Sequence, residues 1–456
     1  MTEVVPSTKA CAVNPLKVSP ALGGAMAFLG VDGSLPLFHG SQGCTAFALV
    51  LMVRHFHEAI PLQTTAMSEL TTILGGADNV EAAIGNIRER NQPKLIGILS
   101  TALTETRGED IGAELKAMRE RHPEWHDLDL VYASTPDYGG SLEEGWGASV
   151  KAMIETLVPE ERGPRTLRQV NVLAGSHLTP ADAEEIREII ESFGLSPLIL
   201  PDLAGSLDGH VPDHHIPTSL GGTPPAAIRE LGRSAVTFAM GEHMRPAAEA
   251  LTRRTGVPFR LFDHVTGLAA SDAFIAALME VSGTPAPERV KRERSRLIDA
   301  MLDGHFFFEG KHIAIAAESD LLLAVAALLA AMGAHVGAAV IPCPSPAAAR
   351  VPAARVLVGD LGDLEKAAHG CDLVIANSHA RELAERLGLP LFRLGFPVFD
   401  RLGGPQRVSV GYRGTRCLIF DLANLLLDHA AGAHAAVGGN AHELLEEEHH
   451  AQAQAG

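Results

Sequence analysis

Apolar segments of strand length alternate with amphipathic segments of helix length along most of the chain. The clearest case lies between residues 169 and 201, where an apolar strand-like segment at 170–174 is followed by Thr179, a favourable helix cap, and by Pro180 at the first helical position. Gly194 is predicted to end this helix, and residues 197–200 resume a strand. The apolar positions that share one face of the helix are Ala183, Ile186, Ile190 and Phe193. The pattern predicts a strand–helix–strand unit.

The same alternation recurs on both sides of this unit. Further strand-like segments lie at 95–100, 130–134, 235–239, 259–262, 313–317, 336–341, 372–376 and 390–393, and helix-like segments at 246–255, 321–332 and 380–387. Strands that alternate with helices are typical of parallel sheets covered on both faces. The sequence therefore predicts the α/β class.

Two polar stretches suggest where this long chain divides. Residues 158–166 are rich in Pro, Arg and Glu, and residues 283–294 contain two prolines and a run of charges. We therefore predict three α/β domains at 14–160, 165–292 and 300–432, followed by a tail at 433–456. The tail is rich in Ala, His and Glu, and its His449 and His450 are expected to be solvated side chains of a frayed or surface segment.

One uncharged run, residues 321–342, is long enough to suggest a membrane span. Gly333 divides it into a helix-like part and a strand-like part, which favours a buried helix and strand of a parallel sheet. The start of the sequence lacks the features of a signal peptide, and the formal net charge of −18 disfavours nucleic acid and anionic membranes as partners. A cytoplasmic protein is expected.

The five cysteines, Cys11, Cys44, Cys343, Cys371 and Cys417, are widely spaced and include no CxxC pair. Their number and spacing disfavour a disulfide framework, a zinc ribbon or a self-contained cluster motif. Cys371 and Cys417 are expected in the core. Cys343 directly follows a predicted strand, where sites of α/β proteins are often built, although we expect a structural role.

Cys44 has the most informative surroundings. It follows a Gly-Ser-Gln-Gly turn that ends with Gly43, and glycines allow a backbone to approach a ligand closely and present its amides. A thiolate in this place is a candidate metal ligand. A free cysteine buried at a helix start is the commoner outcome, and the spacing alone favours it because one cysteine cannot hold a cluster.

Other polar segments carry weaker signals. Residues 100–110 and 135–141 follow predicted strands and suit either a ligand-facing loop or a hydrogen-bonded cap, and a role of 105–110 in partner binding is a guess. His210, His214 and His215 lie close in sequence but lack the spacing that would aim their rings together, so a surface loop is expected. No complete phosphate-binding glycine motif follows a strand.

Several motifs of the first third resemble the nitrogenase component 1 superfamily. They are NPLK at 14–17, LGGA at 22–25, HGSQGC at 39–44 and RHF at 54–56. The segments PLQTTAM at 61–67 and STALTETRGED at 100–110 resemble, within that superfamily, the N subunits of the scaffold on which the iron–molybdenum cofactor of nitrogenase is assembled. The resemblance covers residues 14–430.

This resemblance implies three Rossmann-like domains and an α2β2 heterotetramer with a NifE-type subunit. Catalytic β chains of the superfamily present three cysteines to a large cluster, but here Ser19 and Ala102 stand where the first and third would be, and Cys44 alone remains. The resemblance implies that Cys44 is one ligand of a [4Fe-4S] cluster that the E subunit completes, with Gly43, Ser19 and Ala102 close to it. It also implies that the partner holds the maturing cofactor precursor and that the nitrogenase iron protein binds transiently.

Three functions remain open at this stage. The first is a scaffold subunit without turnover of its own, which relays electrons through the shared cluster. The second is a catalytic nitrogenase-type β subunit, against which the missing thiols at Ser19 and Ala102 argue. The third is a nucleotide-dependent α/β oxidoreductase, which would be stable without iron or a partner.

Overall fold

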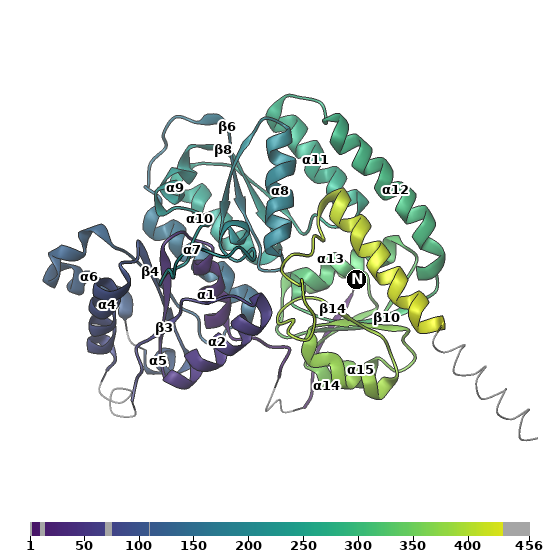
Figure 1. Cartoon of the computed structure of the whole chain (residues 1–456), viewed down its shortest axis with the longest axis horizontal. Helices are drawn as coiled ribbons and strands as arrows, with labels where there is room; N and C mark the ends of the chain where they lie inside the picture. Colours follow the sequence, from purple (N-terminus) through teal and green to yellow (C-terminus); the bar gives the residue numbers. More distant parts are fainter. Residues whose placement is uncertain (1, 10–13, 69–74, 109, 432–456) are drawn as a thin grey trace, which may run out of the picture.

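The structure is a computed structural model that describes residues 2–9, 14–68, 75–108 and 110–431. Its strands form three sheets, and every pairing between named strands is parallel. Helices flank each sheet, so the α/β class predicted from the sequence is correct (Figure 1). Cys11 and the tail, with His449 and His450, lie outside the described residues.

The first sheet has the order β3-β2-β4-β5. Its strands are β2 (Ser34–His39), β3 (Gln63–Thr64), β4 (Leu95–Ser100) and β5 (Asp129–Ala133). Its helices are α1 (Pro20–Leu29), α2 (Gln42–Phe56), α4 (Ala77–Asn91), α5 (Ala102–Arg107), α6 (Ile111–Arg121) and α7 (Leu142–Leu157). Alternate residues of β4 face opposite sides: Leu95 and Leu99 pack with α1 and α7, and Ile96 and Ile98 with α4 and α6. Burial on both faces explains why the strand is apolar throughout.

The second sheet has the order β7-β6-β8-β9. Its strands are β6 (Thr166–Leu173), β7 (Ser196–Leu200), β8 (Ser234–Met240) and β9 (Phe259–Phe262), and its helices are α8 (Pro180–Ser192), α9 (Pro225–Arg229), α10 (Arg245–Thr255), α11 (Leu268–Ser282) and α12 (Glu288–Phe308). The predicted strand–helix–strand unit is present, because Thr179 caps α8 by accepting a hydrogen bond from the Asp182 amide. Gly194 ends the unit's helical segment with a left-handed φ of 68°.

The third sheet has six strands in the order β1-β12-β11-β10-β13-β14. These are β1 (Glu3–Pro6), β10 (His312–Ala316), β11 (His335–Ile341), β12 (Arg355–Val358), β13 (Leu373–Ala376) and β14 (Leu391–Arg393), with helices α13 (Ser319–Ala331), α14 (Leu361–Ala367) and α15 (Arg381–Leu387). The uncharged run forms α13 and β11, as predicted. Within the described part of the chain, no helix combines the length and apolar character that crossing a membrane requires.

Two features differ from expectation. The chain start adds strand β1 to the edge of the third sheet, beside β12, a pairing that four residues of sequence could not reveal. The polar stretch at 283–294 is irregular only as far as Pro287, because its charge run begins α12 and faces solvent while Val290 and Leu297 face the core. A run of charged residues on the solvent side of a helix has the same composition as a linker, which is why the sequence suggested a linker here. The proposed domain limits remain predictions.

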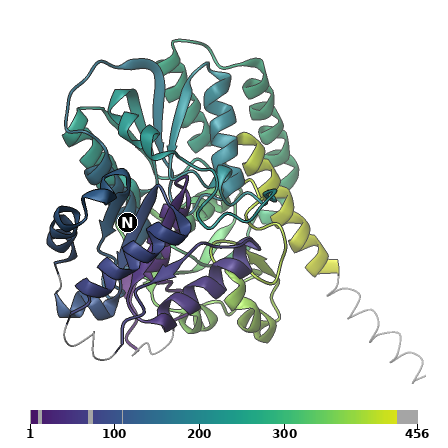
Figure 2. The same ribbon diagram turned by 60° about the vertical axis from the view of Figure 1, so that its left-hand side comes forward.

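Two apolar cores extend across the sheets. One joins α1, α2 and α7 to α10, and the other joins α8, α11 and α12 to α13 and to the helix at 411–431. This last helix lies along α12 in both views (Figures 1 and 2), with Arg416 Nη1 2.8 Å from Glu293 Oε2. The continuous packing brings the carboxyl ends of β6, β8 and β10 together in the middle of the molecule.

Candidate functional site

The turn between β2 and α2 presents Cys44. Strand β2 ends at His39, Ser41 precedes the helix, and Cys44 is its third residue and is exposed. Gly40 packs so closely on the first sheet that a Cβ there would lie 2.6 Å from Thr101 Oγ1. The Ser41 hydroxyl lies 3.5 Å from Cys44 Sγ. The amides at a helix start are unused donors that favour an anionic or sulfur-rich ligand, so this exposed thiol is well placed to bind one.

Large apolar side chains are exposed on α2 and α5 near the turn that presents Cys44. Phe47 is 69% exposed and Val50 is 52% exposed, three and six residues further along α2. Leu103 of the neighbouring α5 is 38% exposed. Residues three or four apart share a helical face, so Cys44, Phe47 and Val50 form one outward stripe. We call these residues, with Leu103, the α2 surface.

Ser19 and Ala102 lie at elements that meet the α2 surface. Ser19 directly precedes α1, its hydroxyl donates to the Asp137 carboxylate, and it lines the same surface hollow as Phe47. Ala102 begins α5 directly after β4, which pairs with β2. Gly43 is exposed beside Cys44. No second thiol belongs to this edge of the first sheet among the residues that the structure describes.

The other described cysteines do not join this group. Cys371 is buried, as predicted, and burial raises its pKa. Cys343 is also buried, and burial raises its pKa to about 11, which disfavours a thiolate ligand. The prediction for Cys417 was wrong: this cysteine is exposed, because Leu418, Ile419 and Leu422 occupy the core-facing side of its helix.

Contacts within the chain account for polar residues of two segments marked as candidates. His210, His214 and His215 are exposed, and His210 pairs with Asp208, which agrees with the predicted surface loop. Glu105 of α5 accepts hydrogen bonds from three hydroxyls, including that of Ser134 at 2.5 Å, so it ties α5 to the ends of β4 and β5. A role for residues 105–110 in partner binding stays a prediction.

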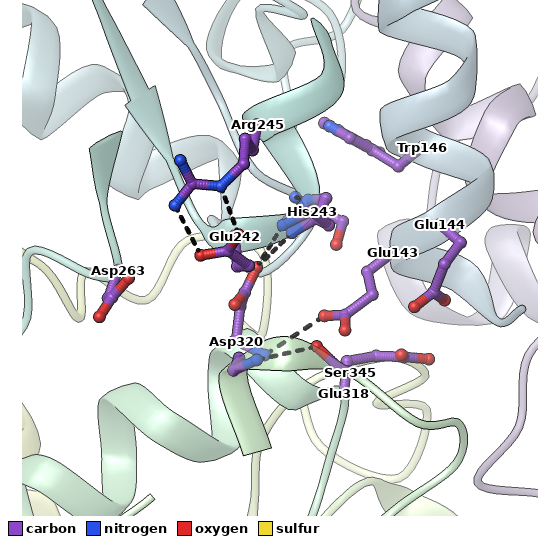
Figure 3. Close-up of polar contacts among 12 residues, drawn as sticks. Glu143, Glu144, Trp146, Glu242, His243, Arg245, Asp263, Glu318, Asp320 and Ser345 are labelled. Carbon is purple, nitrogen blue, oxygen red and sulfur yellow. Dashed lines mark hydrogen bonds and ion pairs between the residues drawn. The ribbon is translucent and has the colours of Figure 1, made fainter. Parts of the chain in front are cut away.

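The sequence reasoning missed a buried polar cluster where the three sheets meet. His243 Nδ1 donates to Asp320 Oδ2 at 2.5 Å, and the Asp320 amide donates to Glu143 at 3.3 Å (Figure 3). Glu318 accepts a hydrogen bond from Ser141 at 2.6 Å. We call the set His177, His243, Asp320, Glu143, Glu144 and Glu318 the junction cluster. Within the described chain, none of its carboxylates pairs with lysine or arginine.

The pKa values of three carboxyl groups in the junction cluster depart strongly from their ordinary values. Burial, reinforced by the neighbouring Asp320 and Glu318, raises the pKa of Glu143, and burial raises the pKa of Glu318 to about 8. Burial also opposes ionisation of Asp320, but the hydrogen bonds from His243 and the charges of His243 and His177 together outweigh it and lower the pKa of Asp320 to about 2. A buried set of side chains with strongly shifted pKa values is a candidate functional site.

A sequence signal for the junction cluster did exist. His177 follows β6, His243 follows β8, and Glu318 and Asp320 follow β10. Polar residues just past the carboxyl ends of parallel strands are where α/β proteins build sites. The signal was lost because it depends on three sheets converging, which no single stretch of sequence encodes.

Comparison with known proteins gives the class of the chain. A family model for nitrogenase component 1 type oxidoreductases matches residues 19–427, so the chain belongs to that family. Among solved structures, one titled "Nitrogenase Cp1 at pH 6.5" superposes with a TM-score of 0.89 at 29% identity, covering 92% of this chain and 94% of the other.

Within this family, the similarity points to one kind of protein. The chain is 52% identical over 434 residues to the nitrogenase iron-molybdenum cofactor biosynthesis protein NifN of Bradyrhizobium diazoefficiens, covering 94% of this chain and 92% of the relative. It is 47% identical to NifN of a Nostoc species, with 94% and 96% covered. It is 42% identical to NifN of Klebsiella pneumoniae, with 93% of both chains covered. The resemblance stated from the motifs is thereby confirmed.

Proposed function

We propose that this chain is a subunit of the scaffold on which the nitrogenase iron–molybdenum cofactor is assembled, and that Cys44 supplies one ligand to a [4Fe-4S] cluster shared with a NifE-type partner. The observation that carries the proposal is the single exposed thiol in the first turn of α2. The names of the relatives support the biosynthetic role. The α2 surface supports a site completed by another chain.

The residues present fit a shared cluster and not a self-contained one. A [4Fe-4S] cubane is held by four thiolates. Cys44 offers one, while the hydroxyl of Ser19 and the methyl group of Ala102 offer none. The exposure of Cys44 leaves its sulfur accessible to a second chain that supplies the remaining three.

The α2 surface is suited to burial by a partner. Phe47 and Val50 lie with Cys44 on one face of α2 and Leu103 lies on α5, so three large apolar side chains are exposed at this edge of the first sheet, whereas isolated exposed apolar residues would need no explanation. Aromatic side chains such as Phe47 are typical of the buried centre of interfaces. A partner that covered the α2 surface would exclude water from the cluster, and two such pairs would give the α2β2 heterotetramer.

In this arrangement the chain acts without turnover of its own. The shared cluster would supply one-electron transfer from the iron protein, while the partner holds the maturing cofactor precursor. This chain's residues contribute a ligand, a cover for the cluster and part of a surface for the iron protein.

The decisive experiment uses the chain co-expressed with a NifE-type partner and purified without oxygen. We expect the dithionite-reduced complex to give the EPR signal of a reduced cubane, and a Cys44→Ala variant to lose or alter it. Cys417→Ala is the matched control, because Cys417 is also exposed but lies on the C-terminal helix. An iron-free complex, or a signal indifferent to Cys44, would remove the proposal.

A catalytic nitrogenase-type β subunit is the second candidate, favoured by the structural likeness to a nitrogenase. It predicts substrate reduction by the complex when the iron protein and ATP are present. The scaffold proposal predicts cofactor maturation under the same conditions without substrate reduction. A nucleotide-dependent oxidoreductase would instead be active as the isolated, iron-free chain.

A further inference from the structure

The junction cluster contains buried acceptors that nothing in the described chain satisfies. Asp320 has a fully buried side chain, yet its Oδ1 has no hydrogen-bond partner. Neither ring nitrogen of His177 has one, and the same is true of Glu318 Oε1. Buried polar atoms without a partner cost free energy and require an explanation. Three unsatisfied groups in one place indicate that an occupant belongs there.

The geometry of these groups suits a metal ion. One ligand atom each from His177, His243 and Asp320 lie within 4.8 Å of one another. Neighbouring ligands of a four-coordinate metal with bonds of about 2.0–2.2 Å are roughly 3.5 Å apart, so side-chain movements of about 1 Å complete the site. One ligand atom each from Glu143, Glu144 and Glu318 also lie within 4.8 Å of one another, and they add further oxygen donors beside it.

We propose that His177, His243 and Asp320 bind one divalent transition-metal ion of the Fe2+ or Zn2+ class. Two imidazoles and one carboxylate favour such an ion over Mg2+ or Ca2+, which prefer oxygen ligands alone. His243 now uses both ring nitrogens, one toward Asp320 and one accepting the Ser176 amide at 3.1 Å. Its coordination therefore exchanges one of these hydrogen bonds for a metal bond.

The proposed ion has a side open to a ligand. His177 and Glu318 line a cavity of about 80 Å³ between the three sheets. Three protein ligands leave coordination positions free, and His177 places one edge of the site at this cavity. The site is independent of the Cys44 cluster, which lies at the first turn of α2 on the surface.

The test is Co2+ binding to the full-length chain in a Cys44→Ala background, after treatment with a chelator, followed by the visible d–d absorption of Co2+. We expect one Co2+ per chain at this site, and an affinity at least about tenfold weaker in both His177→Gln and Asp320→Asn. Matched controls are His210→Gln and Asp299→Asn, which change the same residue types at exposed positions and are expected to alter the affinity less than twofold.

A second readout guards against a folding defect. Saturating Co2+ or Zn2+ is expected to raise the melting temperature of the parent chain but not that of Asp320→Asn, whose side chain has the same size. If His177→Gln does not fold, Asp320→Asn alone decides. Absence of binding, binding unchanged in Asp320→Asn, or binding lost only in His210→Gln would overturn the proposal.

Discussion

The α2 surface and the junction cluster differ in where their reactive side chains lie: those of the first are exposed and those of the second are buried. At the α2 surface, one thiol stands in the open among apolar side chains, with too few ligands to hold a cluster. In the junction cluster, six ionisable groups lie together inside the chain, and several of their acceptors have no partner among the described residues. We propose that the first region is completed by another protein and the second by an ion small enough to enter this one.

The largest expected effect concerns completion of the α2 surface by a partner. Replacing Phe47 and Val50 together by Asp places two charges where the proposed interface excludes water. We expect the affinity for the NifE-type partner to fall at least about 100-fold, or roughly 3 kcal/mol, because buried charges without partners are strongly unfavourable. Analytical ultracentrifugation or co-purification would measure it.

Leu167→Asp is the control for this pair, since Leu167 is 76% exposed on the second sheet. It is expected to leave association unchanged. Equal loss of association in both variants would show that added charge, and not the α2 surface, is responsible. Unchanged association of the double variant would place the interface elsewhere.

The second prediction tests whether buried polar groups hold the sheets together even where they are fully satisfied. Asp182 is completely buried and accepts hydrogen bonds from the amides of Thr179, Ser409 and Val410, at 3.1, 2.6 and 3.2 Å. Asp182→Ala leaves these donors unpaired. We expect the free energy of unfolding to fall by roughly 3 kcal/mol and the melting temperature to fall by several degrees, both measured by calorimetry.

Asp110 gives the matched control, because it caps α6 at an exposed position through one hydrogen bond of 3.0 Å. Asp110→Ala is expected to cost about 1 kcal/mol. Equal effects of the two substitutions would mean that Asp182 acts only as a cap for α8 and not as a link to residues 409–410.

The sequence predicts features that depend on neighbouring residues better than features that depend on distant ones. Helix α8 was readable because Thr179, Pro180 and Gly194 act within their own neighbourhood. The α2 turn was recognisable because its motif is contiguous, although spacing alone favoured a buried Cys44. The junction cluster was missed because His177, His243 and Asp320 are separated by whole strand–helix units. Cys417 was misplaced because a one-residue shift around a helix exchanges the core for solvent.

The third prediction concerns pH and the carboxyl end of α2. His55 Nδ1 accepts a hydrogen bond from the Val398 amide at 3.0 Å, and its ring meets Phe396 edge-on. Burial lowers the pKa of His55 to about 4, below its ordinary value of about 6.5. The unfolded chain therefore binds more protons in this range, and His55 makes stability fall as the pH drops from about 6.5 to about 4.

His55 should contribute about 1–2 kcal/mol of this loss by pH 5. Calorimetry between pH 7 and pH 5 would detect it as a fall in melting temperature that is smaller in a His55→Asn variant. His57→Asn is the control, since His57 is exposed and the same residue type. If the melting temperatures of the parent and His55→Asn changed identically with pH, His55 would not be the source of the pH dependence.

The prediction with the smallest expected effect tests whether a contact on one side of α2 holds the helix in place while its other side presents Cys44. The Arg54 guanidinium carbon lies 4.0 Å from the centre of the Phe399 ring, which joins α2 to a loop that follows the third sheet. Arg54→Met keeps the aliphatic stem and removes the cation, and should cost about 0.5–1 kcal/mol. Arg90→Met, at an exposed position of α4, should cost less. If loss of this contact also broadened the EPR signal of the complex, the anchor would fix the orientation of Cys44; an unchanged signal would limit Arg54 to stability.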